Sequence, residues 1–251
     1  MTWFQRQEGG GPPLLAPRQL VALGALALAL PLIDQWARPL LWPGISLLVF
    51  MVGFTFIPLL RGVSWKLRGV AVAVPLWLAA AMGATSYALT ITPIHQLWGA
   101  GILGLALASL AHRRIKVLLN PKMLELLGPV TGVNAVSGAL IALFTTVGEE
   151  LFFRGYLAPA TAQLTNLLLA CILNAAIFSG QHWLHRDRES RTGIDYVALG
   201  ALGLISSWSY LTGNSITWSI TLHAAYNFTA IARPILVWLV SRPSQEKGAQ
   251  S

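Results

Sequence analysis

The chain has 251 residues, of which 55% are hydrophobic and 10% are charged, and its mean hydropathy is +0.63. Soluble globular domains carry about 25% charged residues, so this composition excludes a disordered chain and argues against a soluble domain. The net charge of +8 would suggest a nucleic-acid partner in a soluble protein. In a membrane protein, basic residues in short loops set the orientation instead, so we expect no nucleic-acid partner.

Long apolar runs dominate the chain, and a transmembrane helix needs about 20 mostly apolar residues. Eight runs are long enough, near 19–37, 39–60, 67–88, 95–112, 137–161, 165–184, 194–212 and 215–241. The sequence therefore predicts an all-α, polytopic membrane protein with about eight transmembrane helices. The membrane domain would cover 19–241, between a flexible cytoplasmic tail at 1–18 and a second cytoplasmic tail at 242–251. The less apolar segment 121–136 is predicted to be an interfacial helix or loop.

The basic residues of the loops predict the orientation, because cytoplasmic loops carry the Lys and Arg excess. With the N-terminus inside, 14 basic residues fall on the inner side and only Arg38 falls on the outer side. The inner residues are Arg6, Arg18, Arg61, Lys66, Arg68, Arg113, Arg114, Lys116, Lys122, Arg186, Arg188, Arg191, Arg242 and Lys247. We therefore expect an N-in, C-in protein of a cytoplasmic-type membrane.

The fifth run carries ionisable residues inside an apolar stretch. Glu149, Glu150 and Arg154 lie within the six residues EELFFR. An Asp, Lys or Arg at the centre of a membrane helix costs about 2.5 to 3.5 kcal/mol, so such a cluster indicates a functional site. Glu150 and Arg154 are spaced i,i+4 and could equally well form a structural pair. Glu149 points about 100° away from Glu150 and needs a partner on another helix.

Few candidate partners exist. His182 ends the sixth run, and His223 and Asn227 share one face of the eighth at i,i+4 spacing. If the fifth and sixth runs form a hairpin near Gln163, Glu149 and His182 lie about 21 and 28 Å from its outer end, close enough to meet in tilted helices. His223 and Asn227 would lie about 12 to 18 Å deep, so we expect a re-entrant or late-starting helix there.

These groups are suited to hydrolysis. A carboxylate and an imidazole in a water-accessible pocket can deprotonate water for attack on a carbonyl. A second imidazole and a carboxamide can donate hydrogen bonds to the oxyanion that forms. Glu149, His182 and His223 would also form a His2Glu zinc set, but the chain lacks HExxH spacing and any evident partners for metal ligands. We therefore favour a metal-free glutamate mechanism with no cofactor, and keep zinc as the alternative.

Three motifs on separate apolar runs carry a resemblance to a known family. EELFFR at 149–154 matches EExxxR, Phe178 with His182 at 178–182 matches FxxxH, and His223 with Asn227 at 223–227 matches HxxxN. In this order they resemble the CPBP family of intramembrane proteases, which includes type II CAAX prenyl endopeptidases and bacteriocin-processing or immunity proteins. The motifs lie in roughly the C-terminal half of the chain.

The resemblance implies an eight-helix membrane protease with a site near the cytoplasmic side. On this basis Glu149 and His182 would activate the water, His223 and Asn227 would form the oxyanion hole, and Glu150 and Arg154 would support the site. The substrate would be a membrane-embedded or lipid-anchored protein or peptide, with prenylated proteins as one class. The sequence predicts no particular oligomeric state.

Two other classes of protein could use the same polar cluster. A noncatalytic membrane protein could bind a peptide or bacteriocin and keep the cluster for structure. An ion-coupled transporter could use the Glu and His residues as a proton relay, although the chain shows no repeated half with broken helices. We favour the endopeptidase because the cluster offers both a base and oxyanion donors.

Overall fold

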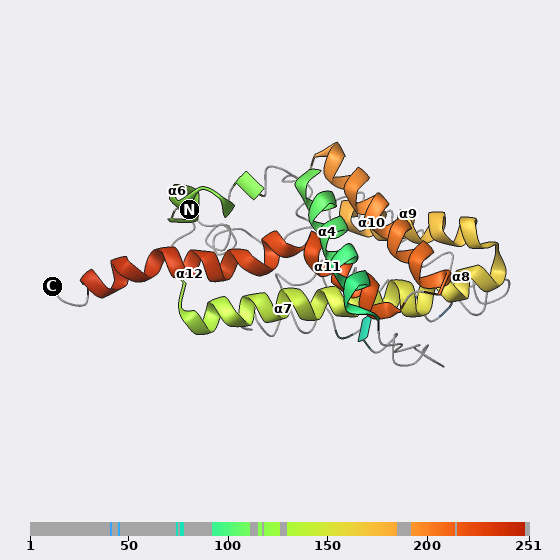
Figure 1. Cartoon of the computed structure of the whole chain (residues 1–251), viewed down its shortest axis with the longest axis horizontal. Coiled ribbons are helices and arrows are strands. Elements are labelled where there is room, and N and C mark those ends of the chain that lie inside the picture. The colour runs from blue at the N-terminus through green and yellow to red at the C-terminus, as the bar shows by residue number, and fades with distance from the viewer. Residues whose placement is uncertain are drawn as a thin grey trace.

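The computed structural model describes residues 92–110, 115–116, 118–125, 130–184, 192–213 and 215–248, together with the single residues 41, 45, 74, 76 and 77. Helices make up nearly all of this part of the chain, and it contains no strand (Figure 1). The elements are α4 (Ile94–Leu110), α6 (Pro121–Glu125), α7 (Gly132–Glu150), the π-helical segment η4 (Leu151–Leu157), α8 (Ala158–Leu164), α9 (Leu167–Leu184), α10 (Gly193–Leu211), α11 (Ile216–Tyr226) and α12 (Phe228–Gly248). The all-α prediction is confirmed for these residues.

Several of these helices are suited to a bilayer. Gly132–Leu164 and Gly193–Leu211 are long and apolar enough to cross a membrane, and the bent pair Ile216–Tyr226 and Phe228–Ser241 makes a third span if it crosses as one unit. The apolar helices α4 and α9 are shorter. These elements correspond to the last five predicted runs. The eight-span count and the N-in, C-in orientation stay predictions, because the first three runs and the tail at 1–18 lie outside the described residues apart from a few single positions.

Two helices extend beyond the apolar runs predicted from the sequence. The fifth helix begins at Gly132 instead of 137, because Thr131 caps it: its hydroxyl accepts a hydrogen bond from the backbone N–H of Asn134 at 3.3 Å. Of the predicted interfacial segment, only the part up to Thr131 precedes this helix, and it contains the short helix α6. At the other end α12 continues to Gly248, into the predicted tail, since a helix needs apolar residues only where it contacts lipid.

The predicted hairpin between the fifth and sixth runs is present, with a π-helical segment on its first arm. α8 ends at Leu164 and α9 begins at Leu167, next to the expected turn at Gln163. Within η4 the carbonyl of Phe153 accepts a hydrogen bond at 3.0 Å from the side chain of Asn174, which is fully buried on α9. The same carbonyl also accepts from the backbone N–H of Ala158, five residues later, which is the π-helical spacing. The bond from Asn174 therefore joins the arms just beyond the Glu149–Glu150 pair.

The eighth run forms two helices instead of one. α11 and α12 meet at Asn227 and are bent by 52°. The backbone N–H of Asn227 donates to the carbonyl of His223 at 2.8 Å, and its own carbonyl accepts from the N–H groups three and four residues later. The late helix start that we considered is not present, since α11 begins at Ile216; the run is instead broken at Asn227, which ends one helix and precedes the next.

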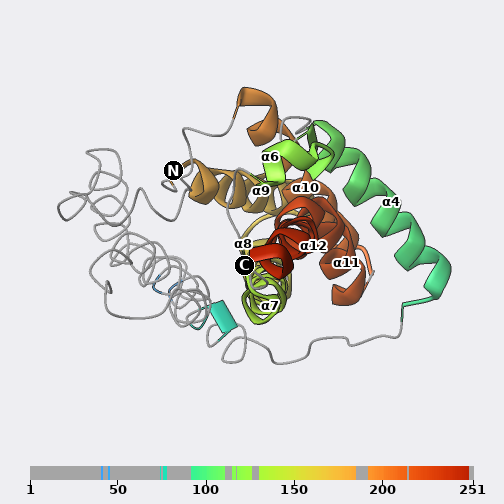
Figure 2. The same ribbon diagram turned by 90° about the vertical axis from the view of Figure 1, so that its left-hand side faces the viewer.

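Two glycines lie where helix backbones approach closely. α4 packs along α11, α9 along α10, and α12 along α7 (Figures 1 and 2). A Cβ atom added at Gly104 of α4 would lie 2.2 Å from the carbonyl oxygen of Leu222, and one at Gly203 of α10 would lie 2.9 Å from the Cα atom of Ala175. Small residues allow such backbone approach between membrane helices. Gly104 therefore places α11, and with it His223, directly against α4.

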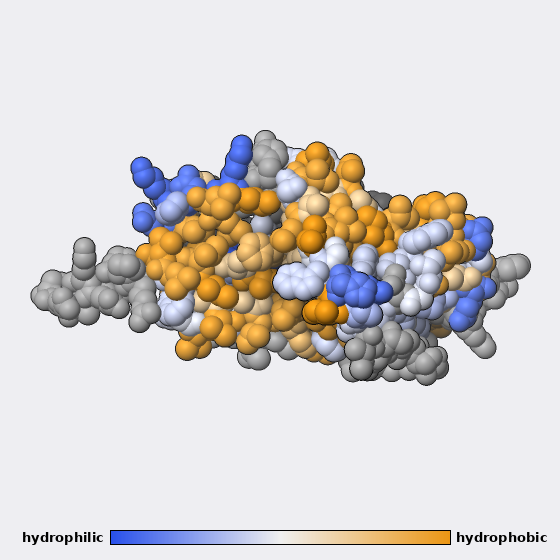
Figure 3. Space-filling view, in the orientation of Figure 1, coloured by the Kyte–Doolittle hydropathy of each residue, from blue (hydrophilic) through white to orange (hydrophobic). Residues whose placement is uncertain are grey.

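The outer face of the helices is apolar. Ile94, Trp98 and Ile102 of α4 are each more than 60% exposed, and Val133 and Leu140 of α7 are exposed as well. Figure 3 shows a broad hydrophobic surface on the face seen there. A contiguous apolar surface of this extent indicates contact with lipid or with other apolar helices.

The glycine contact predicts a position-specific effect on stability. We expect Gly104→Ala to destabilise the protein by about 1 to 3 kcal/mol, because the methyl group would overlap a backbone carbonyl. Gly101→Ala is the matched control on the same helix: Gly101 lies about one turn before Gly104, and a Cβ atom there would have no neighbour within 4 Å, so this change should be neutral or mildly stabilising. The measurement is the thermal unfolding midpoint in detergent, and equal midpoints for the two variants would contradict the proposed packing.

Candidate active site

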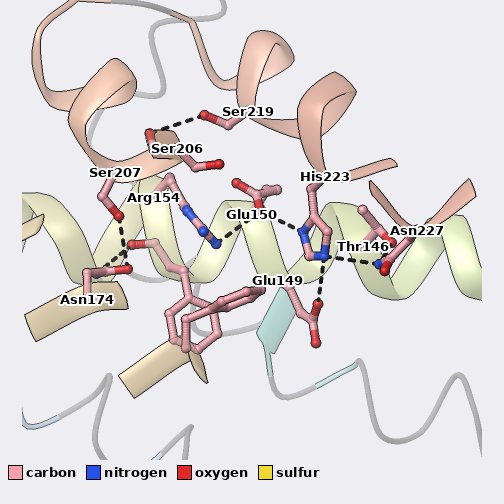
Figure 4. Close-up of polar contacts among 12 residues, drawn as sticks. Thr146, Glu149, Glu150, Arg154, Asn174, Ser206, Ser207, Ser219, His223 and Asn227 are labelled. Carbon is pink, nitrogen blue, oxygen red and sulfur yellow. Dashed lines mark hydrogen bonds and ion pairs between the residues drawn. The ribbon is translucent and has the colours of Figure 1, made fainter. Parts of the chain in front are cut away.

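Three polar residues near the end of α7 lie on its buried side. Thr146, Glu149 and Glu150 are each at most 5% exposed, and Arg154 in η4 is fully buried. Because Glu149 and Glu150 are adjacent, helical geometry turns their side chains in different directions. They consequently contact His223 through different ring nitrogens, and their other partners differ (Figure 4).

Glu150 forms a buried ionic cluster. Its Oε1 atom lies 3.0 Å from Nη1 of Arg154 and 2.7 Å from Nδ1 of His223 on α11. The guanidinium carbon of Arg154 lies 4.5 Å from the ring centroid of Phe178, a cation–π distance. The i,i+4 pair predicted as the structural alternative is therefore formed, and it extends to a third residue on another helix.

Glu149 contacts two other helices. Its Oε2 atom lies 3.6 Å from Nε2 of His223, and its Oε1 atom accepts a hydrogen bond of 3.5 Å from the side-chain amide of Gln181 on α9. The expectation that another helix supplies its partner is confirmed. His223 thus lies between the two glutamates, with one ring nitrogen toward each.

Asn227 lies beside His223, as their spacing predicted. Its Nδ2 atom is 3.0 Å from Nε2 of His223 and donates a hydrogen bond of 3.1 Å to the hydroxyl of Thr146. Asn227 is partly exposed, whereas His223 is fully buried. The carboxamide is accordingly the group of this pair that is nearer to the surface.

His182 reaches the cluster from α9. Its Nδ1 atom lies 2.8 Å from the carbonyl oxygen of Phe178 and 3.2 Å from the side-chain nitrogen of Gln181. The ring of Phe178 lies 4.7 Å from the ring of His182 and 5.4 Å from that of His223, between centroids. Both motif residues of the sixth run are therefore part of the same cluster as Glu149 and His223.

The helices α7 and α11 with η4 thus bring five of the six residues singled out from the sequence into contact, and His182 borders this group through Phe178 and Gln181. Sequence analysis missed Thr146 and Gln181, which connect the predicted residues to one another. A signal for both was present: Thr146 lies one helical turn before Glu149 and Glu150, and Gln181 is a polar residue of an apolar run beside His182. It also missed Asn174, which binds the η4 backbone and accepts a hydrogen bond from Ser207 at 3.3 Å.

The zinc alternative concerns Glu149, His182 and His223. Within the described part of the chain, no three His, Cys, Asp or Glu side chains are grouped in a way that could hold a metal ion. Zinc ligands lie about 2.0 to 2.3 Å from the metal, so a zinc set would require these side chains to move together.

Comparison with known proteins gives one match. Residues 131–229 match the family model for type II CAAX prenyl endopeptidases, Rce1-like. This segment extends from the cap of α7 to the start of α12 and contains all three motifs. The chain matches no curated protein and no solved structure. The resemblance to CAAX-type proteases is thereby confirmed for this segment, and the match indicates a hydrolase of the protease type on apolar, membrane-type helices.

The buried ionic cluster predicts a loss of stability that a second substitution should largely restore. We expect Arg154→Met to destabilise the protein by about 3 to 5 kcal/mol, because it leaves the buried carboxylate of Glu150 without its cation. The double variant Glu150→Gln with Arg154→Met should recover most of this loss, since no unpaired charge remains and glutamine can still accept from His223. Thermal unfolding in detergent measures both effects. Equal destabilisation of the single and double variants would show that the charge pair is not the cause.

Proposed function

We propose that this chain, which carries an Rce1-like type II CAAX prenyl endopeptidase domain at residues 131–229, is an intramembrane endopeptidase in which Glu149 is the general base. The observation that supports this most directly is the placement of Glu149. It is a carboxylate on an apolar membrane-type helix, beside an imidazole from α11 and the side chains of α9. A group of this kind within a membrane segment is a functional site by default.

In the proposed reaction Glu149, with His182, orients and activates a water molecule. Glu149 takes a proton from the water as the water oxygen bonds to the carbonyl carbon of the scissile peptide. The resulting oxyanion accepts hydrogen bonds from Asn227 and from His223, which form the oxyanion hole. The carbon–nitrogen bond then breaks, and Glu149 returns the proton to the leaving nitrogen.

Glu150 and Arg154 support this site without taking part in proton transfer. Glu150 holds the Nδ1 side of His223, and Arg154 neutralises Glu150 at 3.0 Å. Glu150 thereby orients the imidazole of His223, while the carboxylate of Glu149 is left to bind the attacking water. Preorganised groups of this kind are most effective where bulk water is excluded.

The proposed substrate is a membrane-embedded or lipid-anchored protein or peptide. The matched family model names prenyl endopeptidases, so prenylated peptides are the first class to test. The exposed apolar faces of α4 and α7 suit a substrate that arrives within the bilayer. We further propose the eight-span, N-in, C-in topology in a cytoplasmic-type membrane, with the site open to the cytoplasm, as the loop charges indicate.

The role of Glu149 is testable by one isosteric change. We expect Glu149→Gln to reduce cleavage of a lipidated or membrane-embedded peptide library by about 10²- to 10⁴-fold, because glutamine cannot accept the proton. The fold should survive, since glutamine can still bond to Gln181. Glu125→Gln, at an exposed position of α6, is the matched control and should keep wild-type turnover. Unchanged cleavage in Glu149→Gln would rule out Glu149 as the base, whereas a retained phenotype in a protein that cleaves no peptide would point to a noncatalytic peptide-binding protein.

Metal dependence separates the two forms of the mechanism. We expect cleavage to persist after dialysis against a chelator, because the proposed base is a carboxylate and no step uses a metal. His182→Ala should still abolish most of the activity, since His182 is proposed to orient the water. Activity that is lost on chelation and restored by zinc would replace this mechanism with a zinc one that uses Glu149, His182 and His223.

A further inference from the structure

Within the described residues, Arg154 is a fully buried cation with one ion-pair partner. Its Nη1 atom lies 3.0 Å from Oε1 of Glu150. Its Nε and Nη2 atoms have no hydrogen-bond partner in the part of the chain that the structure describes. Burial removes the water that would solvate a charge, so a buried guanidinium needs more compensation than one contact provides. The groups that lie against the guanidinium are the next candidates for that compensation.

The aromatic ring of Phe178 lies against this guanidinium. The Cζ atom of Arg154 lies 4.5 Å from the ring centroid of Phe178 and 5.8 Å from that of Phe153. The face of an aromatic ring is negative and its edge is positive, so a cation over the face is attracted. The attraction is strongest where water is excluded, and Phe178 is fully buried. The face of Phe178 is thus a second partner for Arg154, and it comes from α9.

Neighbouring rings hold the plane of Phe178. Its centroid lies 5.1 Å from that of Phe153 and 5.4 Å from that of His223, and both rings are nearly perpendicular to it, at 86° and 83°. The ring of His182, one turn later on α9, lies 4.7 Å away and is tilted by 56°. Edge-to-face pairs give aromatic rings a preferred relative orientation. Turning the face of Phe178 away from the guanidinium would therefore break these ring contacts.

The position of the guanidinium matters for the imidazole of His223. The Oε1 atom of Glu150 contacts both Nη1 of Arg154 and, at 2.7 Å, Nδ1 of His223 (Figure 4). Because one oxygen serves both groups, a shift of Arg154 changes where Glu150 holds the ring. A displaced ring also changes the 3.6 Å contact between Nε2 of His223 and Glu149. The sequence of contacts thus begins at the ring of Phe178 and ends at Glu149.

We infer that Phe178 is a positioning residue: the negative face of its ring holds the guanidinium of Arg154 against Glu150 and so fixes the imidazole of His223. The alternative is that Phe178 only fills space in the core. The two differ in one property, because attraction for a cation depends on the charge distribution of the ring and space filling depends on its volume. The effect on cleavage rests on the proposed function, whereas the contact between Phe178 and Arg154 does not.

The experiment replaces Phe178, in the full-length protein in detergent, with phenylalanine that carries one, two or three ring fluorines. Fluorine withdraws electron density from the ring face and changes the ring volume little, so each fluorine weakens the attraction for a cation. We expect the thermal unfolding midpoint to fall stepwise, by about 2 to 4 °C at three fluorines. A midpoint that does not change along the series would overturn the inference.

The matched control is the same series at Phe152. This residue is also fully buried, and its ring contacts that of Phe153 at 4.9 Å between centroids. Within the described part of the chain it makes no cation–π contact with Arg154. Fluorination at Phe152 should therefore leave the midpoint nearly unchanged. Equal decreases at the two positions would show that fluorine acts through packing, and would overturn the inference.

A change of background tests whether Phe178 acts through Arg154. In the double variant Glu150→Gln with Arg154→Met, the guanidinium is absent and the ion pair is removed as a whole. The Phe178 series should then lower the midpoint no more than the Phe152 series does, because the cation that the ring attracts is missing. A decrease as large as in the wild-type background would show that the ring acts on another group, and would also overturn the inference.

Cleavage kinetics separate positioning from stability. At a temperature well below the lowest midpoint, and with a peptide that the wild type cleaves, three fluorines at Phe178 should lower kcat by about 3- to 10-fold with KM within about twofold, since small displacements of reacting groups are costly. A constant kcat in an active protein would overturn the positioning role. Absence of cleavage by the wild type would refute the proposed function alone, and the midpoint series would still decide whether Phe178 holds Arg154.

Discussion

The site depends on one constraint: two adjacent buried carboxylates must each be given cationic or hydrogen-bonding partners. Glu149 and Glu150 follow one another on a helix whose outer face is apolar, and both are nearly inaccessible. Adjacent helical residues diverge by about 100°, so one partner cannot serve both in the same way. Arg154 and the Nδ1 side of His223 compensate Glu150, while the Nε2 side of His223 and Gln181 face Glu149.

Because their partners differ, the two glutamates differ in how strongly their carboxylates are held. Glu150 has a full cation at 3.0 Å and an imidazole at 2.7 Å, so its charge is tied to the structure. Glu149 has a longer contact of 3.6 Å to the imidazole and a weak amide bond, so its oxygens can still accept from water. The tighter pair is therefore suited to orienting His223, and the looser carboxylate is suited to proton transfer.

The irregular parts of the backbone lie next to the residues of the candidate site. The break at Asn227 ends α11 directly after the turn that carries His223, and it places the carboxamide against α7. The π-helical segment follows Glu150 and is held by Asn174, while Gly104 lets α11 approach α4 at backbone distance. Each feature lies next to a candidate site residue: the break is at Asn227, η4 contains Arg154, and Gly104 contacts the helix that carries His223.

The sequence by itself determined the helical class, the apolar runs and the candidate residues, because lipid compatibility and i,i+4 spacing are local properties of a chain. It did not determine that α7 begins at its Thr131 cap or that the last run breaks at Asn227, since both points are defined by hydrogen bonds that hydropathy does not report. Only the tertiary structure assigned His223 to both glutamates and Thr146 to Asn227. Glu150 and His223 are 73 residues apart along the chain, and Thr146 and Asn227 are 81 residues apart. Only the packing of the helices brings the members of each pair together.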